Sequence, residues 1–254
     1  MNEPALTSIV TGGGRGIGRA IALRLAEEAA VIVVGRTESD LQSVCQEIRR
    51  RGGLAEACAG DVANPATAER AVGLARELGW AVRHLICNAG IGKSGPTESF
   101  EQELWRKILE VNLQGSFYFI QSCLPVMLEA RQGVICLISS ISGLKGYAYT
   151  AAYTASKHAL VGLARSLAQE YGKRGIVVVP VCPGYVESEM TRRTIRGVMK
   201  RRGISEAEAA ELIARVNPQR RIIPAEEVAE MVAFVCSGKV PSLSGNPLIL
   251  SGGE

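Results

Sequence analysis

The sequence predicts an α/β fold: one doubly wound parallel sheet of about seven strands, with helices on both faces. Short apolar runs rich in β-branched residues alternate with amphipathic stretches along the 254 residues. The short runs are apolar at consecutive positions, which is typical of strands buried on both faces of a parallel sheet. Neither a polar linker nor a repeat interrupts the alternation. We therefore expect a single domain spanning residues 1–254.

The individual elements follow from this alternation. Ile17, Ile21 and Leu25 recur at the spacing of one helix face after the first strand, and Val228 and Val232 do so in the last helical pattern. That last pattern opens with a proline followed by two glutamates, as helices commonly begin. The predicted strands are Leu6–Val10, Val31–Val34, Leu54–Cys58, Val82–Cys87, Val134–Ser139, Ile176–Val181 and Pro247–Leu250.

One segment departs from the alternation. Two helix-like pieces follow one another over Glu187–Asn217 with no strand between them. Ser205 and Glu208 form a capping-box pattern at the start of the second piece. An insertion after the sixth strand lies at the carboxyl edge of the sheet, where ligands bind in this architecture. We expect a small helical substrate lid over residues 188–217.

Composition excludes several classes of protein. The net charge of +4 is too small to indicate nucleic acid as a partner. No apolar run reaches about eighteen residues, so no membrane span is expected. Residues 1–10 lack a charged region followed by an apolar stretch, so we expect no signal peptide.

The cysteines and histidines argue against a metal centre. Seven cysteines are scattered, mostly in apolar runs and without the C-x-x-C spacing, and only two histidines are present. This pattern indicates small buried side chains in a reducing compartment, and we expect a cytoplasmic protein with no metal site.

A glycine-rich turn, T-G-G-G-R-G-I-G, lies between the first strand and the first helix. Glycines there let the backbone approach a pyrophosphate, and the helix N-terminus supplies amide donors with partial positive charge. An ordinary tight turn is the alternative, but the strand before and the helix after favour a nucleotide site of the Rossmann type. The residues expected to bind the cofactor here are Gly12, Gly14, Arg15, Gly16, Ile17 and Gly18.

The residues after the second strand indicate NADP. Gly35 and Arg36 stand where an acidic residue would accept hydrogen bonds from the adenosine ribose of NAD. Arg36 and Arg15 could bind the 2′-phosphate of NADP through charge-assisted hydrogen bonds. The alternative is that both arginines are solvated surface charges. Asp61 and Val62, past the third strand, suit an adenine pocket, although Asp61 could also be a helix N-cap.

Two further segments carry candidate cofactor ligands. Asn88, Ala89 and Gly90 end the fourth strand, where small residues let the backbone turn beneath the cofactor or simply form a turn. After the sixth strand, Ser188 could bind the nicotinamide carboxamide or cap the next helix. The neighbouring cofactor candidates are Pro183, Gly184 and Val186, and Tyr185 is a candidate for substrate contact.

The strongest chemical signal is the pair Tyr153 and Lys157, with Ser140 thirteen residues before the tyrosine. Four residues make about one helical turn, so the phenol and the ammonium face the same way. An adjacent ammonium is expected to lower the phenol pKa, and such a phenol can exchange a proton with a carbonyl or an alcohol. Ser139 is a rival for the role of Ser140, and Ser142 a weaker one.

The whole chain resembles the short-chain dehydrogenase/reductase family of about 250 residues. The motifs that carry the resemblance occur in order: the glycine turn, N-A-G, a helix asparagine, the serine, Y-x-x-x-K and P-G. The resemblance implies that Tyr153 is the acid/base and that Ser140 steadies the carbonyl oxygen. It also implies that Lys157 binds the ribose and tunes the tyrosine, and that Asn112 holds a relay water. Small departures are Cys87 and Ser188, where the family often has asparagine and threonine.

The resemblance extends, less specifically, to ketoreductases acting on thioesters of acyl carrier protein or coenzyme A. It also implies a homotetramer. A basic cluster in the lid could meet carrier phosphates, or could be a solvated helix face. Its candidate substrate contacts are Arg192, Arg193 and Arg196, with Ser142 nearer the reaction centre. The alternatives are a dehydrogenase of free alcohols, sterols or sugars, and a non-catalytic NADP-sensing regulator.

Overall fold

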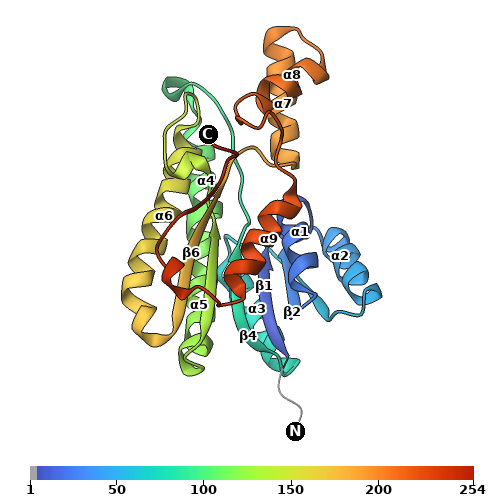
Figure 1. Ribbon diagram of the computed structural model, residues 1–254, viewed down its shortest axis with the longest axis vertical. Coiled ribbons are helices and arrows are strands. Elements are labelled where there is room, and N and C mark those ends of the chain that lie inside the picture. The colour runs from blue at the N-terminus through green and yellow to red at the C-terminus, as the bar shows by residue number, and fades with distance from the viewer. Residues whose placement is uncertain (1–4) are drawn as a thin grey trace.

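The computed structural model describes residues 5–254, and the part of the expected domain over residues 1–4 lies outside it. Seven parallel strands form one sheet in the order β3-β2-β1-β4-β5-β6-β7 (Figure 1). The predicted fold class is confirmed. The strands are β1 (Leu6–Thr11), β2 (Ala30–Gly35), β3 (Ala55–Ala59), β4 (Ala81–Cys87), β5 (Gly133–Ile138), β6 (Ile176–Pro183) and β7 (Leu248–Leu250).

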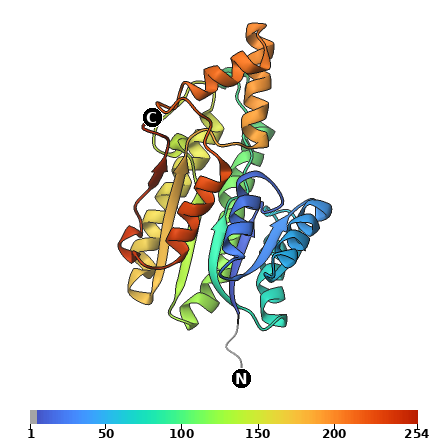
Figure 2. The ribbon, with the colours of Figure 1, turned by 45° about the vertical axis from the view of Figure 1, so that its right-hand side comes forward.

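The helices cover the sheet on both faces (Figures 1 and 2). One apolar core joins the sheet to α1 (Gly16–Leu25), α2 (Glu38–Arg50) and α9 (Ala225–Cys236). A second core on the opposite face joins it to α3 (Pro65–Glu77), α5 (Gly115–Glu129) and α6 (Ala151–Tyr171). Helix α4 (Gln102–Leu109) runs into α5 through a π-helical turn.

The predicted strands are found with small shifts at their ends. Strand β6 continues two residues beyond the predicted end, because Cys182 and Pro183 still pair with β7. The expectation of burial on both faces fails for the outer strands: β3 and β7 have neighbours on one side only, and several of their side chains are partly exposed. Over residues 5–254, no helix combines the length and apolarity that crossing a bilayer requires.

The strand order explains why distant motifs meet. Strands β1 and β4 are neighbours, but the chain runs outward from β1 to β2 and β3 before it returns to β4. In a doubly wound sheet this reversal creates a crevice at the carboxyl ends of the strands. The glycine turn, the N-A-G segment, the serine and the P-G segment follow β1, β4, β5 and β6, which are adjacent in the sheet.

The expected lid is present as two helices, α7 (Glu189–Arg202) and α8 (Glu206–Ala214). They stand above the carboxyl edge of the sheet (Figures 1 and 2). The Ser205 hydroxyl accepts from the Glu208 amide, and the Glu208 carboxylate accepts from the Ser205 amide, as the capping-box prediction requires. Ile195, Ala209 and Ile213 form a small separate core that holds the two helices together.

Candidate active site

The glycine turn is shaped for close approach of a ligand. Gly12 and Gly16 have φ angles of +63° and +52°, which side chains rarely adopt. A Cβ atom on Gly18 would lie 2.1 Å from the carbonyl oxygen of Gly12, so only glycine fits there. Among the described residues, no side chain caps the start of α1. Its first amide groups therefore remain available to a phosphate, and the turn fits a dinucleotide.

A polar pair, the buried Thr11 and the half-buried Asn88, holds this turn against the fourth strand. The Thr11 hydroxyl accepts from the backbone amides of Asn88 and Ala89, at 3.0 and 3.1 Å. The Asn88 side chain donates to the carbonyl oxygens of Thr11 and Gly12, at 2.9 and 3.2 Å. Asn88 thus fixes the glycine turn to the edge of the sheet. The sequence analysis did not identify Thr11, because its structural role depends on Asn88, which is 77 residues away in the chain.

At the adenosine end, Arg15 and Arg36 are exposed. Within residues 5–254 neither guanidinium has an ion-pair partner, so both remain available to an anion. Asp61 accepts from the Ala63 amide at 3.0 Å and lies 3.7 Å from the Lys107 ammonium. The N-cap of α3 is Asn64, so the alternative role of Asp61 as that cap is not observed. Val62 is buried, and a Cβ atom on Gly115 would lie 3.0 Å from its side chain.

Asn112 lies at the π-helical turn, Glu110–Gln114, rather than within a regular α-helix. Its side chain is fully buried and spans the space to the segment after β4. The Oδ1 atom accepts from the Ile91 amide at 2.8 Å, and the Nδ2 atom donates to the Ile91 carbonyl at 2.9 Å. A third hydrogen bond, 3.0 Å long, joins Nδ2 to the Ser156 hydroxyl on α6. The wide turn aims the amide at its partners, and π-turns often mark functional sites.

The structure separates the three candidate serines. The Ser139 hydroxyl is buried and donates to the Lys157 carbonyl oxygen at 2.9 Å, so it braces the backbone of α6. The Ser140 hydroxyl accepts from the Ser142 amide at 3.1 Å. It also forms a hydrogen bond with the Tyr153 phenol, and this bond opposes the rise of the phenol pKa that burial causes. Ser140 is therefore the serine placed beside the tyrosine.

Tyr153 and Lys157 lie on one side of α6, as their spacing predicts. The Lys157 ammonium is 5.6 Å from the centre of the Tyr153 ring and donates to the Ile138 carbonyl at 2.7 Å. A Cβ atom on Gly90 would lie 3.6 Å from this ammonium, so the N-A-G segment passes beside it. A Cβ atom on Gly92 would lie 3.1 Å from the tyrosine ring.

The predicted direction of the tyrosine pKa is wrong for the protein alone. Burial raises the pKa of Tyr153 to about 12, and the Ser140 hydroxyl only partly opposes this rise. Burial also lowers the pKa of Lys157 to about 8, because its ammonium is almost completely removed from water. Desolvation disfavours the charged form of both groups and is the largest cause of both shifts. At neutral pH the phenol therefore holds its proton and can donate it.

The segment after β6 brings the lid to the glycine turn. Gly184 donates its amide to the Leu250 carbonyl at 2.8 Å, and Val186 is buried and bridges to Ile223. Ser188 is the N-cap of α7, and its hydroxyl accepts from the Thr191 amide at 3.3 Å. A Cβ atom on Gly16 would lie 3.6 Å from the Ser188 side chain, so the lid begins directly beside the glycine turn.

The basic cluster on α7 is partly neutralised within the lid. The Glu189 carboxylate lies 3.5 Å from the Arg193 guanidinium and 2.5 Å from that of Arg196. Arg192 is exposed and has no ion-pair partner among residues 5–254. Of the three arginines predicted to meet a substrate, Arg192 alone is thus free of an internal carboxylate.

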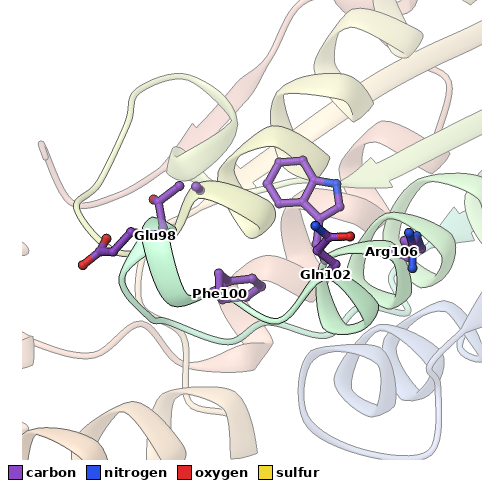
Figure 3. Close-up of a pocket in the computed structure, with 7 residues that line it drawn as sticks. Glu98, Phe100, Gln102 and Arg106 are labelled. Carbon is purple, nitrogen blue, oxygen red and sulfur yellow. The ribbon is translucent and has the colours of Figure 1, made fainter.

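A separate hollow of about 530 Å³ lies beside the start of α6 and is lined partly by α4 (Figure 3). Phe100, Gln102 and Arg106 line it, together with Ala151, which precedes the catalytic candidate Tyr153 by two residues. None of the predicted site residues lines this hollow. The predicted site instead follows the carboxyl ends of β1, β4, β5 and β6.

The chain is similar to known proteins along most of its length. The family model described as short chain dehydrogenase matches residues 7–198. The chain belongs to this family. Cyclohexanol dehydrogenase of Acinetobacter sp. (strain SE19) is 34% identical, over 96% of this chain and 93% of that protein. The 3-oxoacyl-(acyl-carrier-protein) reductase FabG of Escherichia coli (strain K12) is also 34% identical, over 100% of this chain and 98% of that protein.

Among solved structures, an actinorhodin polyketide ketoreductase variant with NADPH superimposes with a TM-score of 0.94. It is 34% identical, and the match covers 98% of this chain and 96% of that chain. The protein is therefore an oxidoreductase of the short-chain dehydrogenase family, which uses a nicotinamide cofactor and interconverts ketones and secondary alcohols. The resemblance expected from the sequence motifs is confirmed.

Proposed function

We propose that this enzyme is an NADP-dependent ketoreductase that acts on 3-oxoacyl thioesters of acyl carrier protein or coenzyme A. The observation that carries the proposal is the meeting of Ser140, Tyr153 and Lys157 at the carboxyl edge of the sheet, beside the glycine turn. A site that only sensed the cofactor would need the glycine turn but not this proton-transfer set. The arrangement therefore favours turnover over the regulator alternative.

The chain's own residues handle the carbonyl oxygen and the proton. Bound NADPH supplies a hydride to the carbonyl carbon. The Ser140 hydroxyl holds the carbonyl oxygen, and the Tyr153 phenol donates its proton to that oxygen as negative charge develops there. The Lys157 ammonium then stabilises the phenolate that remains. Asn112 positions α6 through Ser156 and fixes the segment after β4, and we retain for it the relay role that the family resemblance implies.

The preference for NADP rests on Arg15 and Arg36. Both guanidiniums are exposed at the adenosine end of the turn and carry no internal ion pair in the described chain. Gly35, in place of an acidic residue, adds no negative charge that would repel a 2′-phosphate. Two free arginines can make charge-assisted hydrogen bonds to that phosphate, each contributing on the order of 1.5–3 kcal/mol.

The proposal of a thioester substrate is based on the lid and on relatives of matching length. FabG is a reductase of 3-oxoacyl groups on acyl carrier protein, and it matches the whole chain. The free guanidinium of Arg192 stands on the lid, where it could meet a carrier phosphate. Cyclohexanol dehydrogenase is equally similar, so a free ketone or alcohol is the alternative substrate class. We further propose a cytoplasmic location, which suits seven buried cysteines, and a homotetramer by family resemblance.

The test follows the absorbance of the reduced cofactor with four combinations of substrate and cofactor. Acetoacetyl-coenzyme A and a truncated acetoacetyl thioester without phosphates are each offered with NADPH and with NADH. We expect NADPH to give the higher kcat/KM, and the full thioester to have the lower KM at low salt. Arg192→Ala should raise KM for the full thioester only, because kcat depends on the untouched tyrosine and serine. The chemically matched control is Arg215→Ala, which removes an exposed arginine that pairs with Glu211 on α8.

A preference for NADH would overturn the cofactor assignment. Equal KM values for the two thioesters, with no effect of Arg192→Ala, would overturn the carrier assignment and favour a free ketone.

A further inference from the structure

A carboxylate that is largely removed from water lies on the segment after β7. Glu254 follows β7, and its side chain is only 10% exposed. Its carboxylate lies 3.1 Å from the Lys145 ammonium and accepts a hydrogen bond from the Tyr147 hydroxyl. The same ammonium stands 5.4 Å from the centre of the Tyr147 ring. One carboxylate therefore occupies a compact anion-binding site built from an ammonium and a phenol.

This cluster is attached to the loop between two of the proposed catalytic residues. Lys145 and Tyr147 lie on the loop that connects Ser140 to Tyr153, and the proposed function places this loop beside the substrate. Tyr185, after β6, is close enough to influence both Tyr153 and Tyr147 electrostatically, so the cluster and the reaction centre lie near a common residue. A Cβ atom on Gly253 would lie 3.5 Å from Pro218, which follows the lid. The segment after β7 thus contacts both the loop that carries Tyr147 and the segment that follows the lid.

We propose that Glu254 is a charge gate: it fills the Lys145–Tyr147 anion site with its own carboxylate, so that neutral ketones are accepted and keto acids are excluded. The inference rests on the proposed function and sharpens it. A 3-oxoacyl thioester is neutral at the group next to the ketone, whereas its hydrolysis product carries a carboxylate there. A substrate carboxylate would have to displace Glu254 or lie unpaired beside it, and specificity built on such an unfavourable encounter is common.

The test compares a matched pair of small ketones, methyl acetoacetate and acetoacetate, which differ in charge. The measured quantity is the ratio of kcat/KM for acetoacetate to kcat/KM for the ester, with NADPH. Glu254→Gln keeps the shape of the side chain and its ability to accept from Tyr147, but releases the Lys145 ammonium. We expect this ratio to rise at least tenfold. Adding Lys145→Met to Glu254→Gln should cancel the rise, because no cation then remains to bind the substrate carboxylate.

Control variants separate the effect of the charge gate on this ratio from a general disturbance of the structure. Glu103→Gln makes the same chemical change at an exposed glutamate that pairs with Arg106 on α4, and the ratio should not move. Glu254→Asp retains the charge and should keep the ratio near its wild-type value. Lys145→Met alone leaves the Glu254 carboxylate without its cation, so the ratio should fall. This variant tests the gate even if Glu254→Gln does not fold.

The outcomes are distinct. A ratio that stays constant in Glu254→Gln, or equal changes in both substrates, would overturn the gate and leave Glu254 as a support for the loop. Failure of the wild-type enzyme to reduce even methyl acetoacetate and acetoacetyl thioesters would overturn the proposed function itself, and the gate with it. Reduction of the ester with an unchanged ratio in every variant would overturn the gate alone.

Discussion

Ketone reduction should lose rate when Lys157 loses its proton, and the pH at which this happens is set by burial. Burial lowers the pKa of Lys157 from 10.5 to about 8 in the protein alone. The ammonium is 5.6 Å from the centre of the Tyr153 ring. At that separation a unit charge stabilises a phenolate by about 3 kcal/mol when the effective dielectric constant is about 20. Since each 1.4 kcal/mol is about tenfold, the neutral lysine should slow proton delivery by roughly two orders of magnitude.

The direction of the pH effect on kcat/KM follows from which protonation form of Lys157 is active. Below the pKa the lysine is charged and reduction is fast; above it the charge is gone and kcat/KM falls. The negative charge of bound NADPH favours the ammonium, so we expect the inflection between about 8 and the ordinary value of 10.5. The assay follows NADPH absorbance with methyl acetoacetate from pH 6 to 10.5, at saturating cofactor.

Two variants decide whether the inflection belongs to this lysine. Lys157→Met should show the lower rate at every pH, with no inflection in this range. Lys239→Met changes an exposed lysine far along the chain and should keep the wild-type profile. A wild-type profile that is flat to pH 10.5, or an inflection that persists in Lys157→Met, would refute the reasoning.

Three further predictions test other parts of the site. Tyr153→Phe should lower kcat at least about a hundredfold because it deletes the proton donor, while NADPH affinity, measured by cofactor fluorescence, should change little. Gly18→Ala should weaken NADPH binding at least about tenfold, because its Cβ would lie 2.1 Å from a backbone carbonyl, whereas Gly162→Ala in an open part of α6 should not. Burial lowers the pKa of His84 to about 4, so the unfolded chain binds a proton that the folded chain excludes between pH 6.5 and 4. The free energy of unfolding should therefore decrease by up to about 3 kcal/mol as pH falls through that window, and urea titrations should show this loss in wild type but not in His84→Gln.

The geometry of the glycine turn and of the tyrosine–lysine pair could be predicted because its signals are local. The glycine turn lies between one strand and the next helix, and Tyr153 and Lys157 share a single helix turn. Such patterns need only the periodicity of one element and the chemistry of neighbouring residues. The capping box of Ser205 and Glu208 was predictable for the same reason.

Other features depend on contacts that leave no pattern in the sequence. The choice between Ser139 and Ser140 depends on where β5 ends and which hydroxyl then faces α6. The role of Thr11 depends on a partner across the sheet. The tyrosine pKa was predicted in the wrong direction because the sequence shows the nearby charge but not the burial that outweighs it.

The proposed substrate half of the site consists of three segments that follow β5, β6 and β7. Glu254 meets Tyr147 across 107 positions of the chain, and no spacing rule connects them. The family match ends at residue 198, before α8 and before Glu254. Two relatives of equal identity are named for substrates as different as cyclohexanol and a carrier-bound acyl group. If the part that the family shares determines the hydride and proton transfer, then the residues that select the substrate should lie in the segments after residue 198. Exchanging the segment after β7 should therefore change which ketones are accepted and leave the pH dependence set by Lys157 unchanged.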